Sequence, residues 1–304
     1  MNHTQEDRLT GCLVGLAVGD AVGTTVEFAP RGTFEPLTDM IGGGPFRLDP
    51  GQWTDDTSMA LCLADSLLSC GGFDAKDQMR RYCEWRDSGL WSSRDYCFDI
   101  GNTVSLALNL YEETGDPIAG STNPYSAGNG CIMRLAPVPM YFYPDRELIL
   151  AQSAQSSTTT HGATECVDSA KLLSSVLFRA FDGCAKDEVL FGDKGRFEGS
   201  PKVVELAEGV YKDKSESEIA GTGYVIDCLE ASLFCFERTG SYREAVLMAA
   251  NLGDDADTTA AVCGQIAGAY YGLAGIPEEW VQKIARKDEI FELAQRLARS
   301  APKA

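Results

Sequence analysis

Glycine recurs every fourth residue in two apolar segments, and this spacing restricts what the chain can fold into. The first series is Gly11, Gly15, Gly19 and Gly23, and the second is Gly264, Gly268 and Gly272. A period of four places residues on one face of a helix, where each glycine costs about 0.5–1 kcal/mol relative to alanine. Close approach of two helices is the simplest compensation. The stripes either serve packing alone or place the ends of two core helices around one site.

Helical periodicity dominates the rest of the chain, without a convincing series of alternating strands. Helices are expected over 8–27, 56–70, 75–86, 103–113, 147–156, 166–181, 203–210, 224–238, 242–252, 257–273, 277–285 and 288–298. Two long Gly/Pro-rich loops, 32–52 and 116–130, have a length that is often functional. No low-complexity linker divides the chain. We therefore predict an all-α fold, a single compact many-helix orthogonal domain spanning residues 1–304.

The charge balance excludes some function classes. Against 26 Lys and Arg residues the chain has 45 Asp and Glu, a net charge of −19. Nucleic-acid backbones and anionic membrane surfaces need basic patches, so neither is an expected partner. The uncharged segment 258–277 has transmembrane length. Because it is rich in Ala and Gly and begins against several aspartates, we expect it to be a buried core helix.

The cysteines and histidines limit which catalytic and metal-binding groups the chain can use. None of the 11 cysteines is spaced as C-x-x-C, and Cys62, Cys228 and Cys263 lie in apolar runs typical of small buried hydrophobes. A reducing compartment and, since no export signal is evident, a cytoplasmic location are expected. The only histidines are His3 and His161. Catalysis is therefore expected to use carboxylates and metals.

Two segments combine aspartate and threonine at the start of an apolar helix: WTDDT at 53–57 and GDDADTT at 253–259. N-capping is one interpretation, because Asp and Thr favour helix starts, but a single carboxylate satisfies it. Two or three carboxylates within four residues repel one another unless a cation is present. Oxygen ligands without His or Cys suit Mg²⁺ or Mn²⁺. If the fold joins the two segments, they can form a two-metal site.

Two further carboxylates and three glycine-rich loops complete the candidates. Asp99 lies at another expected helix start, where helix capping is the alternative to a functional role. Glu27 ends the first glycine-striped helix, where the dipole disfavours a carboxylate, so it indicates either a metal or catalytic partner or an exposed surface position. The loops 42–44, 128–130 and 221–223 offer backbone amides near helix starts that can receive phosphate.

These motifs occur in a recognisable order. The segments are GDAVGTTVEF (19–28), GGGPFRLDPGQWTDDT (42–57), DIGNT (99–103), SAGNGCIMR (126–134), GTGYVIDCLEA (221–231) and GDDADTTAA (253–261). The ordered set spans nearly the whole chain and resembles the ADP-ribosylglycohydrolase family, which includes dinitrogenase reductase-activating glycohydrolases. The resemblance implies an all-α fold, two Mg²⁺ or Mn²⁺ ions, and cleavage of an ADP-ribose N- or O-glycosidic bond.

The resemblance also implies residue roles. The metal ligands it implies are Thr54, Asp55, Asp56, Asp255, Asp257 and Thr258. Asp99 is the candidate acid at the ribose ring oxygen, and Glu27 is the candidate for water or metal. The residues expected to bind ADP-ribose are Gly43, Gly44, Gly101, Asn102, Asn129, Gly130, Met133, His161, Gly223 and Tyr224. For His161, a satisfied core histidine is the alternative.

The predicted function is hydrolysis of mono-ADP-ribose from modified protein side chains, with the arginine N-linkage favoured over serine by the DIGN segment. The partners are then ADP-ribosylated protein and ADP-ribose. The alternative is a non-catalytic ADP-ribose-binding or toxin-blocking protein on the same fold, against which the retention of all six ligand types argues. A Mg²⁺-dependent diphosphate enzyme such as an isoprenoid synthase is a third interpretation. It is disfavoured because Asp55-Asp56-Thr57-Ser58-Met59 lacks the last acid of D-D-x-x-D.

Overall fold

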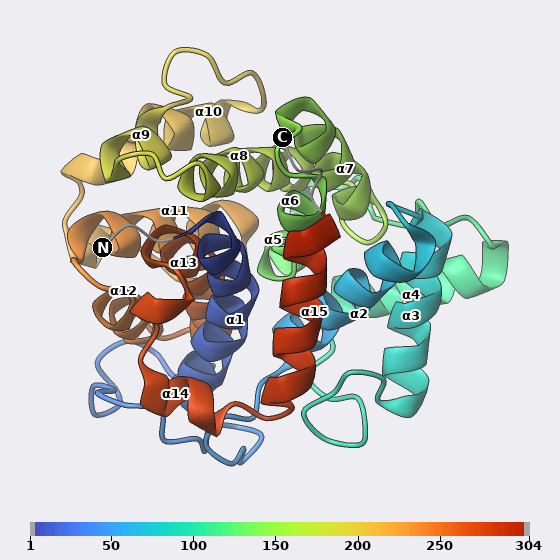
Figure 1. Ribbon diagram of the computed structural model, residues 1–304, viewed down its shortest axis with the longest axis horizontal. Helices are drawn as coiled ribbons and strands as arrows, with labels where there is room; N and C mark the ends of the chain where they lie inside the picture. The colour runs from blue at the N-terminus through green and yellow to red at the C-terminus, as the bar shows by residue number, and fades with distance from the viewer. Residues whose placement is uncertain (1–3, 301–304) are drawn as a thin grey trace.

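A computed structural model describes residues 4–300, and within that range the protein consists of helices joined by loops, with no β-strand (Figure 1). Its α-helices are α1 (Gln5–Gly23), α2 (Asp55–Cys70), α3 (Ala75–Ser88), α4 (Asn102–Thr114), α5 (Gly130–Met133), α6 (Pro137–Phe142), α7 (Arg146–Thr158), α8 (Thr164–Phe181), α9 (Lys186–Phe191), α10 (Pro201–Glu208), α11 (Val225–Arg238), α12 (Tyr242–Ala250), α13 (Ala256–Tyr271), α14 (Glu278–Lys283) and α15 (Lys287–Ser300). Five short 3₁₀ turns are η1 (Thr24–Val26), η2 (Pro124–Ser126), η3 (Val210–Asp213), η4 (Glu216–Glu218) and η5 (Leu273–Gly275). The prediction of an all-α fold is confirmed.

All twelve expected helices have a counterpart in the structure. The helices α6 and α9, six residues each, lie outside the expected ranges, and α5 is a single turn. Segments this short carry too few residues for a helical period to be visible. The loop expected over 32–52 contains no helix.

The two glycine stripes face each other in an antiparallel pair, α1 against α13. A Cβ atom added to Gly15 would lie 2.3 Å from the carbonyl oxygen of Gly264, and one added to Gly264 would lie 2.2 Å from the carbonyl oxygen of Gly15. Gly11 meets Gly268 near one end of the pair, and Gly23 meets Ala256 at the other. The last turn of α1 therefore lies beside the first turn of α13. The interpretation that the stripes bring two helix ends together is confirmed.

The remaining helices surround this pair (Figure 1). α11 and α12 pack against α13, and α15 packs against α1 and α2. The helices α2, α3 and α4 enclose a second, smaller apolar cluster that includes Met79, Tyr82 and Trp85. α2 contacts both α1 and the helices of this smaller cluster, so it lies between the central α1–α13 pair and the cluster. That the whole of 1–304 forms one domain stays a prediction.

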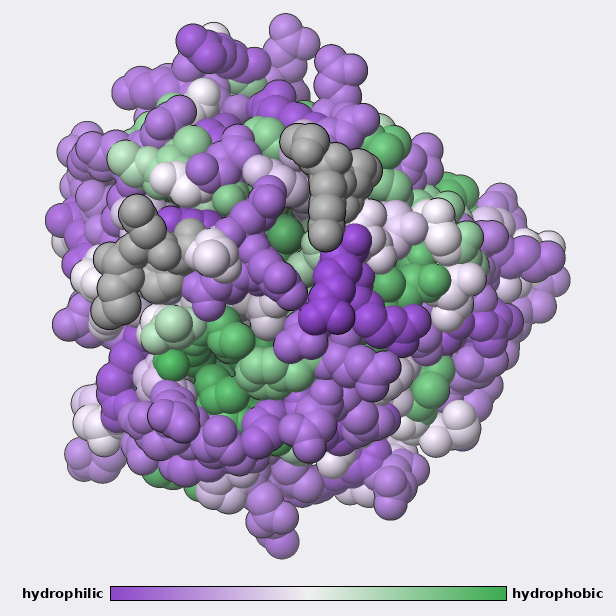
Figure 2. Space-filling view, viewed as in Figure 1, coloured by the Kyte–Doolittle hydropathy of each residue, from purple (hydrophilic) through white to green (hydrophobic). Residues whose placement is uncertain are grey.

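Two helices that resemble membrane spans are buried instead. α1 is long and apolar enough to cross a membrane, but the rest of the fold covers almost all of it. α13, the core of the uncharged segment 258–277, is likewise buried along nearly its whole length, as predicted. On the face shown in Figure 2, hydrophilic residues cover most of the surface and apolar residues are confined to smaller patches.

Candidate active site

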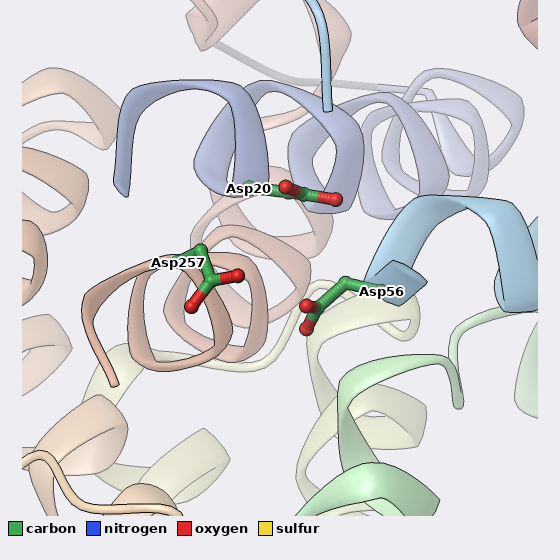
Figure 3. A group of neighbouring side chains, drawn as sticks. All are labelled: Asp20, Asp56 and Asp257. Atoms are coloured by element: carbon green, nitrogen blue, oxygen red, sulfur yellow. The ribbon is translucent and has the colours of Figure 1, made fainter. Parts of the chain in front are cut away.

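Three buried carboxylates from three helices converge where α1, α2 and α13 meet. Asp20 lies in the last turn of α1, and Asp56 and Asp257 lie in the first turns of α2 and α13. Figure 3 shows their side chains directed toward one another. One carboxylate oxygen from each lies within 4.8 Å of the others. The Oδ1 atoms of Asp56 and Asp257 are buried and have no hydrogen-bond partner. Two buried oxygens without a donor indicate a missing positive ligand at this point.

Asp20 was missed by the sequence analysis, and its partners show why. Its carboxylate accepts hydrogen bonds from the backbone N–H groups of Thr54 (2.9 Å) and Thr57 (3.0 Å) and from the hydroxyls of the same residues (3.0 and 2.6 Å). It thereby caps α2 from a distant helix. Burial raises the pKa of Asp20 to about 6, although these hydrogen bonds oppose the rise.

The side chains at the two helix starts do not cap their own helices. Thr54 and Asp255 occupy the N-cap positions of α2 and α13, and neither makes a side-chain capping bond. Instead the Thr54 hydroxyl lies 3.1 Å from Asp257 Oδ2 and 3.2 Å from Asp56 Oδ2, and the Thr258 hydroxyl lies 3.3 Å from Asp56 Oδ2. The fold therefore joins the two Asp–Thr segments into one site, and capping does not account for them.

A second carboxylate group extends this site toward the surface. One oxygen each from Glu27, Asp99 and Asp257 falls within 4.8 Å of the others. Glu27 is only 5% exposed, which excludes the surface-glutamate interpretation. Asp99 adopts a left-handed backbone conformation with φ 61°, and α4 begins three residues later with Gly101 as its N-cap. Asp99 is therefore not the helix cap that the sequence left possible.

The electrostatics of the cluster are those of a site without a counter-charge. Burial, then the charges of Asp99 and Asp255, raise the pKa of Glu27 to about 9, and burial, then Asp20 and Asp255, raise that of Asp99 to about 8. Burial is also the main cause of the raised pKa values of Asp56 and Asp257. Among residues 4–300, no Lys or Arg forms an ion pair with these carboxylates. A hard divalent cation fits this all-oxygen donor set, because it would satisfy the two orphaned oxygens and stabilise the ionised carboxylates.

A cavity of about 400 Å³ opens above the cluster. Of the sequence-predicted residues, those that line it are Glu27, Asp55, Asp99, Gly101, Asn102, Asn129, Gly130, Met133, His161, Gly223, Asp255, Asp257 and Thr258. Thr54 and Asp56 are fully buried and are not among the lining residues. Asn129 donates a 2.6 Å hydrogen bond from Nδ2 to Asp255 Oδ2, which connects the loop before α5 to the start of α13.

The predicted glycines of the 42–44 loop are placed differently. Gly43 and Gly44 are not among the residues that line this cavity or its neighbour. Gly44 has φ 67°, and a Cβ atom there would lie 2.0 Å from the carbonyl oxygen of Thr24. Its close approach holds the loop against η1, just before Glu27.

His161 is both a satisfied buried residue and part of the cavity wall. Its Nδ1 lies 2.8 Å from the Thr160 hydroxyl, and the side chain is 2% exposed. Burial and the nearby Arg134 lower the pKa of His161 to about 3, so the ring is neutral. A Cβ atom at Gly130 would lie 2.6 Å from its Cε1 atom, which explains a glycine at that position.

A second cavity of about 650 Å³ adjoins the first and shares Thr103, Gly128 and Gly223 with it. Tyr224 lies here. Its hydroxyl donates to Glu165 (2.5 Å) and accepts from Lys202 (2.7 Å). Sequence reasoning found Tyr224 but neither of its partners, because both come from helices distant along the chain and lie in no motif.

Known proteins resemble this chain in sequence and in fold. The family model described as ADP-ribosylglycohydrolase matches residues 1–304. A solved structure described as an ADP-ribosylglycohydrolase-related protein complex superposes with a TM-score of 0.87 at 41% sequence identity, covering 99% of this chain and 100% of the other.

Curated relatives extend the match. The ADP-ribosylarginine hydrolase Tri1 of Pseudomonas putida is 45% identical over 97% of this chain and 79% of its own length, and that of Serratia proteamaculans is 43% identical over 97% and 80%. The ADP-ribosyl-[dinitrogen reductase] glycohydrolase of Rhodospirillum rubrum is 32% identical over 93% and 92%. With the family motifs assembled at one buried acidic site, the chain belongs to the ADP-ribosylglycohydrolase family.

Proposed function

We propose that this protein is a metal-dependent hydrolase that removes ADP-ribose from arginine side chains of modified proteins. The observation that carries the proposal is the buried carboxylate cluster on the floor of the cavity, with two orphaned oxygens and no cation from the protein. Relatives named ADP-ribosylarginine hydrolases, at 43–45% identity, support the arginine linkage.

Two divalent cations, Mg²⁺ or Mn²⁺, are proposed as cofactors. The side chains that would hold them are Thr54, Asp55, Asp56, Asp255, Asp257 and Thr258. When bound, such ions would act as Lewis acids toward the substrate and would make a water molecule more acidic. Asp20 is proposed as a positioning residue, because four donors from Thr54 and Thr57 already occupy its carboxylate.

Asp99 and Glu27 are proposed to move protons. Burial and the neighbouring carboxylates raise the pKa of Asp99 to about 8 when no cation is bound, and its place beside the cluster suits it to deliver a proton to the ribose ring oxygen or the departing guanidine nitrogen. The pKa of Glu27 is raised to about 9, which makes its ionised carboxylate a strong base. In that form Glu27 is proposed to accept a proton from the attacking water. The reaction breaks the anomeric C–N bond and yields ADP-ribose and free arginine.

The walls of the two cavities are proposed to bind ADP-ribose. Asn129, Gly130, Met133 and neutral His161 line the first cavity beside the acids, and Tyr224 lines the second. Backbone amides at such glycine-rich turns suit phosphate, which matters in a chain of net charge −19. Phosphate binding by Gly43 and Gly44 remains a prediction that the cavity geometry does not favour.

A cytoplasmic location is proposed on the basis of the cysteines. All 11 are free thiols in the structure, and Cys62, Cys228 and Cys263 are buried as expected. A thiol-rich chain of this kind suits a reducing compartment.

The test is incubation with ADP-ribosyl-arginine, ADP-ribosyl-serine and poly-ADP-ribose, with Mg²⁺, with Mn²⁺ and with EDTA, while free ADP-ribose is measured by chromatography. We expect release from the arginine conjugate only with metal. Binding of ADP-ribose without release from any conjugate would instead support the non-catalytic or toxin-blocking alternative.

A further inference from the structure

Four aromatic side chains from two connecting loops, one between η1 and α2 and one between α3 and α4, form a continuous series of ring contacts beside the acidic cavity. This aromatic wall consists of Phe28, Phe46, Phe98 and Tyr96. The ring centroids of Phe28 and Phe46 are 6.5 Å apart, those of Phe46 and Phe98 5.3 Å, and those of Phe98 and Tyr96 6.0 Å. Phe28 and Tyr96 are 63% and 52% exposed. Phe46 and Phe98 are partly buried, so the wall is exposed at its two ends and partly accessible between them.

The wall is attached directly to the two proposed proton-transfer residues. Phe28 follows Glu27 and itself lines the acidic cavity, and Phe98 precedes Asp99. Phe28 has a left-handed backbone (φ 62°), held by a 2.7 Å hydrogen bond from its N–H to the carbonyl oxygen of Asp254. Bulky residues rarely adopt this conformation, and it strains the backbone. Folding alone does not explain why an exposed phenylalanine is kept there.

The charge around the wall selects a cationic occupant. Ring faces attract cations, and the cavity that Phe28 lines is also lined by Glu27, Asp55 and Asp99. The protein itself places a guanidinium on the far end of the wall. Arg94 lies 5.5 Å from the Phe98 centroid and donates to the Tyr96 hydroxyl and to the carbonyl oxygen of Arg47. The surface is thus shown to accept a guanidinium on an aromatic ring.

We propose that the aromatic wall binds the guanidinium and alkyl chain of the modified arginine, with Phe28 and Phe46 as the contacting rings. This inference rests on the proposed function and adds the residues that select the linkage. The ADP-ribose half occupies the acidic cavity, and the planar cation on its far side lies against the wall. A serine-linked conjugate has neither the positive charge nor the planar group, so it gains nothing from these rings.

The test compares two ligands and three variants by calorimetric titration in EDTA, where hydrolysis does not consume the conjugate. Wild type should bind ADP-ribosyl-arginine more tightly than ADP-ribose. Phe28→Leu and Phe46→Leu, which keep apolar bulk but lose the ring, should weaken ADP-ribosyl-arginine binding by about 2- to 30-fold, the span from an exposed to a desolvated cation–π contact. Phe46→Leu should leave ADP-ribose affinity within about twofold, because Phe46 does not line the cavity that holds that half. Phe28 does line it, so Phe28→Leu should weaken ADP-ribose binding less than it weakens binding of the conjugate. Phe28→Tyr is the matched control and should bind like wild type.

Equal wild-type affinity for the two ligands, including no measurable binding of either, would overturn the proposal. So would an equal loss of both in Phe28→Leu, which would show a structural role. The proposed function is judged separately, by ADP-ribose release from ADP-ribosyl-arginine with Mn²⁺. An inactive wild type that still shows the ligand preference would refute the hydrolase assignment and leave the wall in place.

Discussion

Two buried carboxylate sites in this protein are neutralised in opposite ways. Asp193 is 4% exposed and lies between two arginines, with Arg179 2.9 Å from Oδ2 and Arg146 2.9 Å from Oδ1. Burial acts against ionisation there, but the hydrogen bond and charge of Arg179 lower the pKa of Asp193 below its ordinary value. In the cluster of α1, α2 and α13, Asp56 and Asp257 are comparably buried but have no Lys or Arg partner among the described residues. Burial therefore raises the pKa values of both carboxyl groups.

The difference separates a structural acid from a ligand-binding one. A carboxylate that serves only the fold is given its counter-charge by the chain, since an unpaired buried charge is strongly destabilising. The carboxylates of the cluster are also buried, but no Lys or Arg among the described residues pairs with them, and two of their oxygens have no hydrogen-bond donor. The carboxylates of the cluster therefore suit a cation that binds from solution.

The largest expected effect is at Asp257. Asp257→Asn removes a charge from both carboxylate groups, so hydrolysis of ADP-ribosyl-arginine should fall by at least about 10³-fold, as for loss of a principal transition-state stabiliser. Stability in EDTA should hold or rise, because repulsion between carboxylates is relieved. Asp254→Asn is the matched control: it is exposed, lies three residues away, and has a left-handed conformation that Asn tolerates. Undiminished turnover in Asp257→Asn would refute the role of the cluster.

A second prediction concerns Asp99, which lies at the edge of the cluster. Asp99→Asn should lower kcat by about 10²–10⁴-fold, the span for loss of a positioned acid. Metal binding and ADP-ribose affinity should remain. Steady-state kinetics beside a calorimetric ADP-ribose titration checks this, with Asp95→Asn in the same loop as control. Near-normal kcat would remove Asp99 from the mechanism, and lost ADP-ribose affinity would show that it acts in ground-state binding.

The structural site should respond in stability rather than in activity. Asp193→Ala leaves Arg179 buried without its partner and should lower the free energy of unfolding by about 3 kcal/mol, measured by urea denaturation. Turnover per folded molecule should be unchanged. Arg146→Ala should cost less, since that side chain is 43% exposed. If Asp193→Ala lost activity but kept its stability, the distinction between a structural site and a ligand-binding site would be contradicted.

The smallest expected effect is a pH dependence of opposite sign at the two sites. The pKa values of Glu27 and Asp99 are raised to about 9 and about 8 in the folded protein, so their stabilising contribution is present at low pH and lost as pH rises through those values. Asp193, with its lowered pKa, loses its contribution only in acid. In EDTA, Tm should fall by about 2–4 °C between pH 6 and pH 9.

Saturating Mn²⁺ should remove most of that fall, since a bound cation stabilises the ionised carboxylates. The Glu27→Gln/Asp99→Asn double variant should likewise show a flatter profile in EDTA. Differential scanning calorimetry across this pH range makes the comparison, and equal slopes with EDTA and with Mn²⁺ would contradict it.

The fold and most of the site could be predicted from the sequence because their signals are local. The glycine stripes of α1 and α13 are periodic, and the Asp–Thr segments mark two helix starts directly. Asp20 was not predicted as a site residue because a capping carboxylate supplied by another helix has no sequence signature. The only available signal was an aspartate on the glycine-striped apolar helix. The capping interpretation of Asp99 failed because the helix begins three residues later than the carboxylate.

Other features depend on how loops meet in space. Phe28, Phe46 and Phe98 are distant along the chain, and only the folded loops bring their rings together. Gly44 is expected to bind ADP-ribose from the family resemblance, and the structure adds a packing role that the sequence did not indicate, because a Cβ atom there would meet the carbonyl oxygen of Thr24. A glycine that binds a ligand and one that permits tight packing look the same in sequence.

The central claim is that the carboxylates of α1, α2 and α13 hold divalent cations, and direct counting tests it best. Mn²⁺ titrated into the metal-free protein is followed by electron paramagnetic resonance of the free ion, for wild type and Asp257→Asn. We expect two bound ions per wild-type chain and a clear loss of affinity or stoichiometry in the variant. No binding by wild type above the level of Asp257→Asn would contradict it.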